Sequence, residues 1–465
     1  MSEGFEQHSG QSKEGPFRTA EEAVAWICGL TAFGIRPGLE RIEWLMRKFD
    51  YPHRRLRFIH VAGTNGKGSV CAQLTSVLRQ CGYDVGTFTS PYLTSYAERM
   101  KYNETNIDDE TLLKLANRLK PAADELAATP LGAPTMFEIT AALAILYYAT
   151  VTFPDYVVWE TGLGGRLDVT NIVVPVVSVI TGIGHDHHDV LGPTLEDITR
   201  EKAGIIKPGV PVVVAERRPE LVQIFREIAA EKKASLYVLG EQFNYETLHV
   251  AEDEQRFKFS GPFREIPDLV ITMNGKHQQQ NAAAAVMTLE ILRQYYALIM
   301  EDEDLAEGLR RARWPGRMEM VSRAPRILLD GAHNPEGMEA LAASLKDIYR
   351  FDRLNVMLAM MPNKNHEDSL RHILPMSDLL VITEPDYHKK MPAAELAEKA
   401  RRLQAEFGRP RSIVVEPDWR KALDALQSAE GARDAGTLNL VTGTLYLVAD
   451  VRSWLLHGNQ SEKGW

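Results

Sequence analysis

The stretch that decides the fold runs from His60 to Ser69 and reads HVAGTNGKGS. It overlaps the end of an apolar segment, Leu56–Ala62, that is typical of a buried strand. It leads into Lys67–Gln80, where apolar residues recur at helical spacing. A glycine-rich turn between a strand and a helix lets several backbone N–H groups point at one anion, and the helix N-terminus adds its positive end. The stretch therefore predicts a phosphate-binding loop.

Each residue of this loop is a predicted phosphate contact: Gly63, Thr64, Asn65, Gly66, Lys67, Gly68 and Ser69. Lys67 supplies a mobile positive charge, and Ser69 supplies a hydroxyl within reach of a magnesium ion. The spacing Gly-x-x-Gly-Lys-Gly-Ser is shorter than the common phosphate-loop pattern, which has four residues between its glycines. An incidental glycine-rich turn is therefore the alternative interpretation.

Most of the chain alternates strand-like and helix-like segments, which implies parallel sheets with helices on both faces. The predicted fold class is α/β. Expected strands are Leu56–Ala62, Val85–Thr89, Asp155–Glu160, Val174–Thr181, Val210–Ala215, Arg326–Asp330, Leu354–Met360, Leu379–Thr383, Ser412–Val415 and Leu438–Val441. Expected helices include Lys67–Gln80, Asp108–Leu119, Thr135–Thr150 and Gln278–Tyr295.

Proline and glycine at Trp314-Pro315-Gly316 interrupt the helical pattern before them, and this predicts a domain boundary. We expect a frayed tail over residues 1–16, a phosphate-loop domain over 17–313 and a smaller Rossmann-like domain over 314–465. The tail is polar and lacks the apolar core of a signal peptide.

Composition excludes several classes of protein. Among 465 residues, 45% are hydrophobic and 25% are charged, which is the balance of a soluble globular protein. A net charge of −10 argues against general binding to nucleic acid or anionic membranes. Three cysteines are too few for a disulfide framework, and the longest apolar stretch, Ile139–Phe153, is too short to span a bilayer. We therefore expect a cytoplasmic protein.

An acidic residue ends one of the expected strands. Asp155–Glu160 is apolar until Glu160, which places this carboxylate at the carboxyl edge of a parallel sheet, the edge where phosphate loops also lie. A hard cation there needs such an oxygen ligand, although a solvated acid at a strand exit is equally compatible with the pattern. The flexible loop that follows carries Arg166 and Asp168.

A cluster of His and Asp residues, Gly184–Asp189, follows the strand Val174–Thr181. Zinc is the first metal that such a cluster suggests, but the lack of a nearby thiolate and the presence of a phosphate loop favour magnesium. An exposed polar loop is the alternative. Lys202 then closes a short helix that opens with the capping box Thr194–Asp197, and composition alone favours a helix-dipole role for it.

Ordered motifs along the chain resemble the folylpolyglutamate synthases, including the bifunctional dihydrofolate synthases, of the Mur-ligase superfamily. The resemblance covers roughly Ala20 to Arg452. The matching segments are Gly63–Ser69, Thr89-Ser90-Pro91, Phe137-Glu138, Glu160–Asp168 with Thr170-Asn171, Asp186-His187, Glu201–Gly204, His277–Ala282, Trp314–Arg317, Asp330–Pro335 and Gly443–Tyr446. The chain departs from the family pattern at Tyr92, where members often have histidine.

The resemblance implies an ATP-dependent amide ligase that joins L-glutamate to the γ-carboxylate of a folate through an acyl phosphate, with release of ADP and phosphate. A bifunctional enzyme that also joins glutamate to dihydropteroate is the alternative within the family. Outside the family, the alternatives are another phosphate-loop phosphotransferase or hydrolase and a nucleotide-dependent binding protein. The expected partners are folate, glutamate and ATP, and a monomer is expected.

The resemblance also implies a metal site with two magnesium ions. Ser90 and Glu160 are expected to hold the first ion, with Ser69 near it, and His187 and Lys202 the second. In this family the lysine at the position of Lys202 is carbamylated by carbon dioxide, which turns a cation into an anionic oxygen ligand. That role replaces the helix-dipole interpretation.

Further roles follow from the same resemblance. The expected catalytic residues are Lys67, Glu160, His187, Lys202 and Arg317. ATP contacts beyond the loop are expected from Asn281, Arg317, Asp330 and His333, and folate contacts from Arg166 and Asp168. Asp330 also ends a strand of the second domain, which suits an acid that binds a ribose.

Two local patterns stand outside these roles. Asn334-Pro335 is a good helix start, because Asn caps and Pro fits the first helical position. His388-Lys389-Lys390 is a basic run that either faces solvent or attracts a glutamate or polyglutamate tail.

Overall fold

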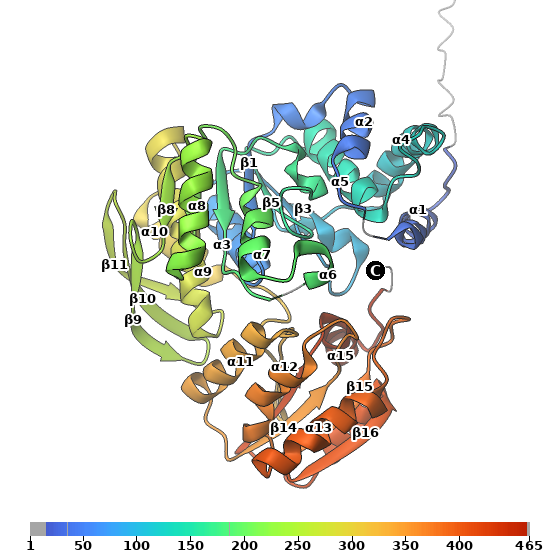
Figure 1. Cartoon of the computed structure of the whole chain (residues 1–465), viewed down its shortest axis with the longest axis vertical. Helices are drawn as coiled ribbons and strands as arrows, with labels where there is room; N and C mark the ends of the chain where they lie inside the picture. Colours follow the sequence, from blue (N-terminus) through green and yellow to red (C-terminus); the bar gives the residue numbers. More distant parts are fainter. Residues whose placement is uncertain (1–14, 35, 186, 463–465) are drawn as a thin grey trace, which may run out of the picture.

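Two units are stacked along the long axis of the molecule (Figure 1). The structure, a computed structural model, describes residues 15–34, 36–185 and 187–462. In these residues an eight-stranded sheet and a three-stranded sheet belong to the first unit, and a six-stranded sheet forms the second. Most of the predicted tail, residues 1–14, lies outside the described residues.

The large sheet of the first unit has the order β4-β3-β2-β5-β1-β6-β7-β8. From β2 to β8 all neighbours are parallel, whereas β3 and β4 add an antiparallel edge. The central strands are buried on both faces, which explains their continuous apolar runs. Their bounds are β1 Phe58–Ala62, β2 Val85–Phe88, β3 Met100–Tyr102, β4 Thr105–Asn106, β5 Tyr156–Glu160, β6 Val177–Ile180, β7 Val212–Val214 and β8 Leu236–Val238.

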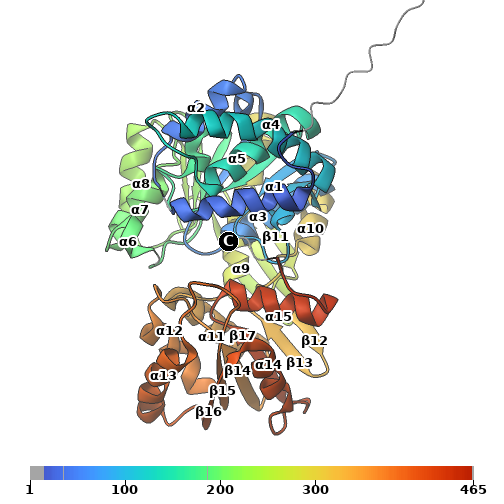
Figure 2. The same ribbon diagram turned by 90° about the vertical axis from the view of Figure 1, so that its right-hand side faces the viewer.

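Helices cover both faces of this sheet because successive strand residues point to opposite sides: Ile59 and Val61 belong to one core and Phe58 to another. One face packs against α3 (Lys67–Gln80), α9 (Lys276–Tyr296) and α10 (Asp302–Arg311). The other packs against α1 (Ala20–Gly29), α2 (Glu40–Lys48), α4 (Asp109–Ala127) and α5 (Met136–Tyr147), and farther along against α7 (Leu195–Ala203) and α8 (Pro219–Glu231). Figure 2 shows α1, α4 and α5 together on this second face.

A buried ion pair fixes α5 against α2. The Arg41 guanidinium lies 2.8 Å from a carboxylate oxygen of Glu138, and Glu138 is fully buried. The same carboxylate accepts a hydrogen bond from the Thr135 backbone N–H, while the Thr135 hydroxyl accepts one from the Glu138 N–H. This capping box starts α5 and leaves Arg41 dependent on Glu138 for its counter-charge.

The three-stranded sheet is antiparallel and was not predicted from the sequence. It consists of β9 (Asn244–Ala251), β10 (Glu254–Ser260) and β11 (Glu265–Ile271), and Phe257 and Phe259 pack into the core beneath α9. The tip of its first hairpin reaches the second unit, where Arg323 pairs with Glu252 and Asp253.

The sheet of the second unit has the order β12-β13-β17-β14-β15-β16, parallel except for the edge strand β12. Its strands are β12 Glu319–Arg323, β13 Arg326–Leu329, β14 Arg353–Leu358, β15 Leu379–Glu384, β16 Ser412–Asp418 and β17 Thr437–Thr442. One face packs against α11 (Pro335–Ile348), α12 (His366–Ile373) and α13 (Ala393–Phe407), and the other against α14 (Trp419–Ser428) and α15 (Leu445–His457).

The predicted α/β class is confirmed, with helices on both faces of two mainly parallel sheets. The helix predicted over Lys67–Gln80 has these bounds, and Asn334 caps α11 by accepting from the Gly337 N–H at 2.8 Å. The strand–helix alternation predicted from the sequence did not include the antiparallel strands or the first two helices, α1 and α2. No helix among the described residues combines the length and apolarity that a membrane span needs.

Candidate active site

The two units enclose one cavity of about 1400 Å³ between the carboxyl ends of their parallel strands. Every site residue predicted from the sequence lines this cavity: Gly63, Thr64, Asn65, Gly66, Lys67, Gly68, Ser69, Ser90, Glu160, Arg166, Asp168, His187, Lys202, Asn281, Arg317, Asp330 and His333. Segments more than 200 residues apart in sequence thus meet at one place, which is where ligands bind in open α/β sheets.

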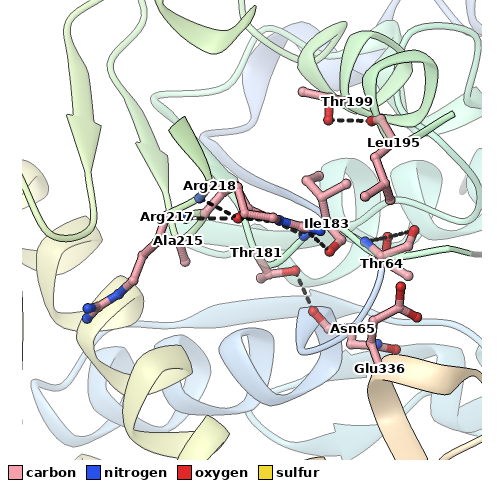
Figure 3. Close-up of polar contacts among 12 residues, drawn as sticks. Thr64, Asn65, Thr181, Ile183, Leu195, Thr199, Ala215, Arg217, Arg218 and Glu336 are labelled. Carbon is pink, nitrogen blue, oxygen red and sulfur yellow. Dashed lines mark hydrogen bonds and ion pairs between the residues drawn. The ribbon is translucent and has the colours of Figure 1, made fainter. Parts of the chain in front are cut away.

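The phosphate loop is shaped by close backbone packing. A Cβ at Gly63 would lie 1.7 Å from the Thr181 hydroxyl oxygen, and Gly63 and Gly66 both have positive φ, at 149° and 88°. The Thr181 hydroxyl donates to the Asn65 carbonyl at 2.6 Å, as Figure 3 shows. The end of β6 therefore holds the loop that follows β1, and only glycine fits at Gly63.

Helix α9 braces the other side of the loop. The Gln278 amide donates to the Ser69 hydroxyl at 3.2 Å and accepts from the Asn281 amide at 3.0 Å. Lys67 folds back over the loop, and its ammonium donates to the carbonyls of Gly63 at 3.0 Å and Thr64 at 3.3 Å. The lysine charge is thereby held over the loop where phosphates are expected.

Glu160 is a buried carboxylate at the end of β5, with 3% of its surface exposed. The Ser90 N–H donates to its Oε2 at 2.9 Å. Burial raises the pKa of Glu160 to about 7, and the charges of Lys67 and Arg317 and the Ser90 hydrogen bond offset this rise only in part. A divalent cation would supply the missing positive charge. Glu160, together with the hydroxyl-bearing residues Ser90 and Ser69 that line the same cavity, therefore suits magnesium, which takes few protein oxygens at phosphate sites.

Lys202 points under the phosphate loop rather than toward solvent. It lies in the last turn of α7, is 4% exposed, and its ammonium donates to the Gly63 carbonyl at 2.8 Å. His187, half-buried and with a φ of 52°, lines the same cavity. Asp186 lies outside the described residues, and those residues contain no group of three His, Cys, Asp or Glu side chains placed to bind one metal ion.

The two predicted folate contacts differ in their surroundings. Arg166 is more than half exposed and pairs with Glu201 at 2.6 Å. Asp168 is buried, and its carboxylate accepts from the N–H groups of Leu163 at 2.7 Å and Thr170 at 3.0 Å. Asp168 therefore shapes the loop that lines the cavity, and its contact with a folate stays a prediction.

The second unit completes the cavity at the end of β13. Asp330 accepts from the N–H groups of Met318 at 3.0 Å and Ala332 at 2.8 Å, which fixes its carboxylate at the cavity wall. His333 lies beside it, with Nδ1 2.8 Å from the Gly331 carbonyl oxygen. Arg317 lines the same wall and belongs to the segment between α10 and β12.

Direct contacts join the phosphate loop to the start of α11. The Asn65 and Asn334 side-chain amides face each other at 3.3 Å. Glu336 accepts from the His185 backbone N–H at 2.8 Å, and Figure 3 shows Glu336 beside Thr64 and Asn65. A nucleotide in the loop would therefore touch both units.

Comparisons with known proteins agree with this geometry. The Mur ligase middle domain matches residues 61–289, and the Mur ligase glutamate ligase domain matches residues 316–445. The dihydrofolate synthase/folylpolyglutamate synthase of Bacillus subtilis is 38% identical over 442 residues, which cover 94% of this chain and 100% of that protein. The chain belongs to the dihydrofolate synthase/folylpolyglutamate synthase family of Mur ligases. Members of this family are ATP-dependent ligases, and so is this chain.

Solved structures of the family share the whole architecture. The folylpolyglutamate synthase of Thermotoga maritima has a TM-score of 0.82 at 34% identity, covering 96% of this chain and 99% of that one. The Mycobacterium tuberculosis folylpolyglutamate synthase complexed with ADP and AMPPCP has a TM-score of 0.86 at 27% identity, covering 95% and 100%. Escherichia coli FolC in complex with DHPP and ADP has a TM-score of 0.81 at 28% identity, covering 93% and 97%. Two of these structures thus contain adenine nucleotides.

Some cavity residues were not expected as site residues. Arg99 carries no local signal, because it stands in an ordinary turn outside the motifs that carry the resemblance. Glu336 lies in the first turn of an amphipathic helix, so its sequence pattern did not indicate a place in the site. Tyr446 belongs to the quoted motif Gly443–Tyr446, and Tyr387 directly precedes the basic run, so both were adjacent to recognised signals.

Proposed function

We propose that this ligase joins L-glutamate to the γ-carboxylate of a tetrahydrofolate or related folate, through an acyl phosphate made from ATP. The observation that supports the proposal best is the shared cavity. It brings the phosphate loop, the buried Glu160 and Lys202 of the first unit together with Arg317 and Asp330 of the second. Its volume of about 1400 Å³ accommodates a nucleotide and a second, pterin-sized ligand.

In the first step the folate carboxylate attacks the γ-phosphorus of ATP, and ADP leaves. The backbone N–H groups from Gly63 to Ser69 bind the phosphates, while Lys67 and Arg317 place positive charge where the transferring group gains negative charge. Asp330 is proposed to accept hydrogen bonds from the ribose. The loop residues act chiefly through position and charge, since phosphoryl transfer requires no covalent contribution from the protein.

The proposal includes two magnesium ions. When bound, they would neutralise phosphate charge and orient the transferring group. Ser90 and Glu160, with Ser69 nearby, are proposed to hold the first ion, and His187 and a carbamate on Lys202 the second. The raised pKa of Glu160 supports this arrangement, because it shows that the buried carboxylate has too little positive charge around it. The position of Lys202 supports it as well, because its side chain lies beneath the loop where phosphates are expected.

In the second step the amine nitrogen of glutamate forms a bond to the acyl carbon and the bond to the phosphate oxygen breaks. The products are the amide and inorganic phosphate, and the amine loses a proton. Water competes with the amine for the acyl phosphate. Enclosure of the cavity by two units limits that side reaction.

The function is tested with purified protein, ATP, magnesium and labelled glutamate, offering tetrahydrofolate or dihydropteroate separately. We expect label in the tetrahydrofolate product. Label joined to dihydropteroate as well would add dihydrofolate synthase activity, the bifunctional alternative. ADP release that does not depend on glutamate would indicate a kinase or hydrolase, and nucleotide binding without any product would indicate a binding protein; either result discards the proposal.

The carbamate is tested by Lys202→Ala. We expect turnover to fall below detection and short carboxylic acids to restore part of it, because an added carboxylate can occupy the vacated place as an oxygen ligand. Lys232→Ala is the matched control, since Lys232 is partly exposed, pairs with Glu231 and does not line the cavity. A Lys202→Ala enzyme with full activity and no added acid would remove the carbamate from the mechanism.

A monomeric, cytoplasmic enzyme is part of the same proposal. Light scattering is expected to give the mass of a single 52.2 kDa chain, with and without nucleotide. A stable dimer would contradict the monomer.

A further inference from the structure

The chain continues past α15 and returns to the first unit. Gly458, with a φ of 68°, ends the helix, and its N–H donates to the Trp454 carbonyl at 3.0 Å. Glycine adopts this left-handed backbone without strain, so the chain can turn sharply here. Figure 2 shows α15 along the edge of the second unit that faces the first. The residues that follow α15 therefore start at the boundary between the two units.

We call residues 458–462 the C-terminal strap, and the second unit holds it through two buried side chains of α15. The Ser453 hydroxyl donates to the Asn459 amide oxygen at 2.9 Å, and the Ser461 hydroxyl donates to Oδ1 of Asp450 at 3.0 Å. Ser453 and Asp450 are fully buried, and Ser461 is 4% exposed. The strap is thus packed onto the helix from which it leaves.

The far end of the strap is bonded to the first unit. The Glu462 backbone N–H donates to the Thr94 carbonyl at 2.8 Å, and the Tyr96 backbone N–H donates to Oε2 of Glu462 at 2.8 Å. Burial raises the pKa of Cys28 to about 11, and the Glu462 carboxylate adds to this rise, so its charge also reaches α1. Glu462 itself is exposed, so the strap is attached to the surface of that unit.

The turn that receives the strap is fixed within the first unit. The Glu98 carboxylate accepts from the three successive N–H groups of Leu93–Ser95, at 2.9, 3.1 and 3.2 Å. The Tyr96 hydroxyl lies 2.8 Å from the Thr140 hydroxyl of α5, and Tyr96 is 1% exposed. Because both ends of the strap are bonded to well-packed elements, it can resist separation of the two units.

Both attachment points lie next to the cavity. Ser90 and Arg99, on either side of the turn, line it. In the second unit, Asp450 also accepts from the Asp386 N–H at 3.3 Å, and the next residue, Tyr387, lines the cavity. The strap therefore connects a segment of the cavity wall from the first unit with one from the second.

A second set of contacts between the units involves the three-stranded sheet. Arg323 pairs with Glu252 and Asp253, and the Asn274 amide donates to the Tyr349 hydroxyl at 3.0 Å. Asn274 and Tyr349 are each 3% exposed. Figure 1 shows β9, β10 and β11 at the left edge of the molecule and α15 on the right. The units are therefore held together on two sides, and the strap serves the side of α15.

We propose that the C-terminal strap holds the Thr94–Tyr96 turn of the first unit against α15 of the second, so that the cavity walls stay together while the acyl phosphate waits for glutamate. Glu462 is then a positioning residue, because it acts through the turn and touches no reacting atom. The proposal rests on the proposed function, since it concerns protection of the intermediate of that reaction.

Water is the reagent that the strap is expected to exclude. If the walls separate, a water oxygen can bond to the phosphorus of the acyl phosphate, and the bond from phosphorus to the folate carboxylate oxygen breaks. The folate carboxylate is regenerated, and phosphate and a proton are released. The net reaction is hydrolysis of ATP without an amide. Loss of the strap should therefore uncouple ADP release from amide formation.

The contact itself is tested by hydrogen exchange, with ADP present and without folate or glutamate. The Tyr96 N–H is the probe, because it donates to Glu462. Losing a hydrogen bond to a charged group changes an equilibrium by roughly ten-fold or more, so exchange of this N–H should accelerate about ten-fold in Glu462→Ala. Removal of residues 459–465 should accelerate it further. Glu462→Gln keeps an acceptor and should stay near wild type.

The effect on the reaction is measured as ADP released per amide formed, with ATP, glutamate and tetrahydrofolate. We expect about one in wild type and roughly two or more in Glu462→Ala, with a larger value in the shortened chain. Glu462→Gln should restore most of the coupling. The KM for ATP should stay within about two-fold, because no hydrogen bond to the phosphate loop is removed.

Two control variants change other parts of the surface. Glu430→Ala removes an exposed glutamate of the second unit that does not line the cavity. Arg323→Ala removes an exposed ion pair between the units on the side of the three-stranded sheet, where the buried bond from Asn274 to Tyr349 remains. Both variants should keep the coupling of wild type.

Unchanged exchange at Tyr96 in the shortened chain overturns the contact, and faster exchange with unchanged coupling overturns its role. Equal uncoupling in Arg323→Ala also overturns the proposal, because loss of any contact between the units would then suffice. If the shortened chain does not fold, Glu462→Ala decides, since Glu462 is exposed. A wild-type enzyme without glutamate-dependent ADP release refutes the proposed function instead, and hydrogen exchange, which needs neither folate nor glutamate, still decides the contact.

Discussion

Replacing Glu160 with glutamine should make the protein more stable while it removes activity. The carboxylate is 3% exposed, and burial raises its pKa from 4.5 to about 7. A raised carboxyl pKa means that the folded state loses stability as the pH rises from about 4.5 to about 7, because the folded protein disfavours the charged form. Each pKa unit corresponds to 1.36 kcal/mol, so the charged Glu160 costs about 3 kcal/mol at pH 8.

Glutamine keeps the shape of the side chain and the acceptor for the Ser90 N–H, which now lies 2.9 Å from Oε2. Glu160→Gln should therefore gain about 3 kcal/mol over wild type at pH 8 but less than about 1 kcal/mol at pH 5, where most of the cost is absent. Turnover should fall by several orders of magnitude, because the amide supplies no negative charge to a divalent cation.

The assay is denaturant unfolding of both proteins at pH 5 and pH 8, without nucleotide or magnesium and at equal ionic strength. A gain that is the same at both pH values would show that packing, not charge, is responsible. A variant less stable than wild type at pH 8 would refute the reasoning, since it would mean that the charged carboxylate is stabilised by its surroundings. Glu160 would then be a structural residue.

Two further substitutions test other parts of the structure. Glu138→Ala should destabilise the protein by about 3–5 kcal/mol in urea unfolding, because it leaves Arg41 buried without its carboxylate; a loss below about 1 kcal/mol would contradict the buried pair. Gly68→Ala should lower kcat by ten-fold or more in ADP-release assays, because its Cβ would lie 2.5 Å from the Trp314 ring, and overpacking costs about 1–3 kcal/mol. Gly29→Ala, where nothing lies within 4 Å of an added Cβ, should behave as wild type, and equal effects of both glycine changes would refute the steric argument.

The sequence predicted best where several local signals agreed. Lys67–Gln80 has helical periodicity and follows a glycine turn, and its bounds are those of α3. Central parallel strands such as β5 are short apolar runs between breakers, so their positions were also predicted. The carboxyl-edge rule then brought Glu160 to the same side of the sheet as the phosphate loop, without any knowledge of distances.

Other features depend on tertiary contacts that leave little trace in sequence. The strands β9 (Asn244–Ala251) and β10 (Glu254–Ser260) are largely polar on their outer side, and their identity as strands comes from pairing and from Phe257 and Phe259 in the core. Arg99 belongs to the site only because the chain returns to the cavity after β2. For Lys202, composition favoured the helix dipole, whereas the side chain passes beneath the loop and reaches the Gly63 carbonyl.

The facing amides of Asn65 and Asn334 mark a place where two helices begin opposite each other, α3 in the first unit and α11 in the second. Both helices direct the positive ends of their dipoles at this junction, and like partial charges repel. An anion between them turns that repulsion into attraction from both sides. We therefore expect a bound nucleotide to hold the two units together. The whole molecule should then be stiffer when its phosphate loop is occupied than when it is empty.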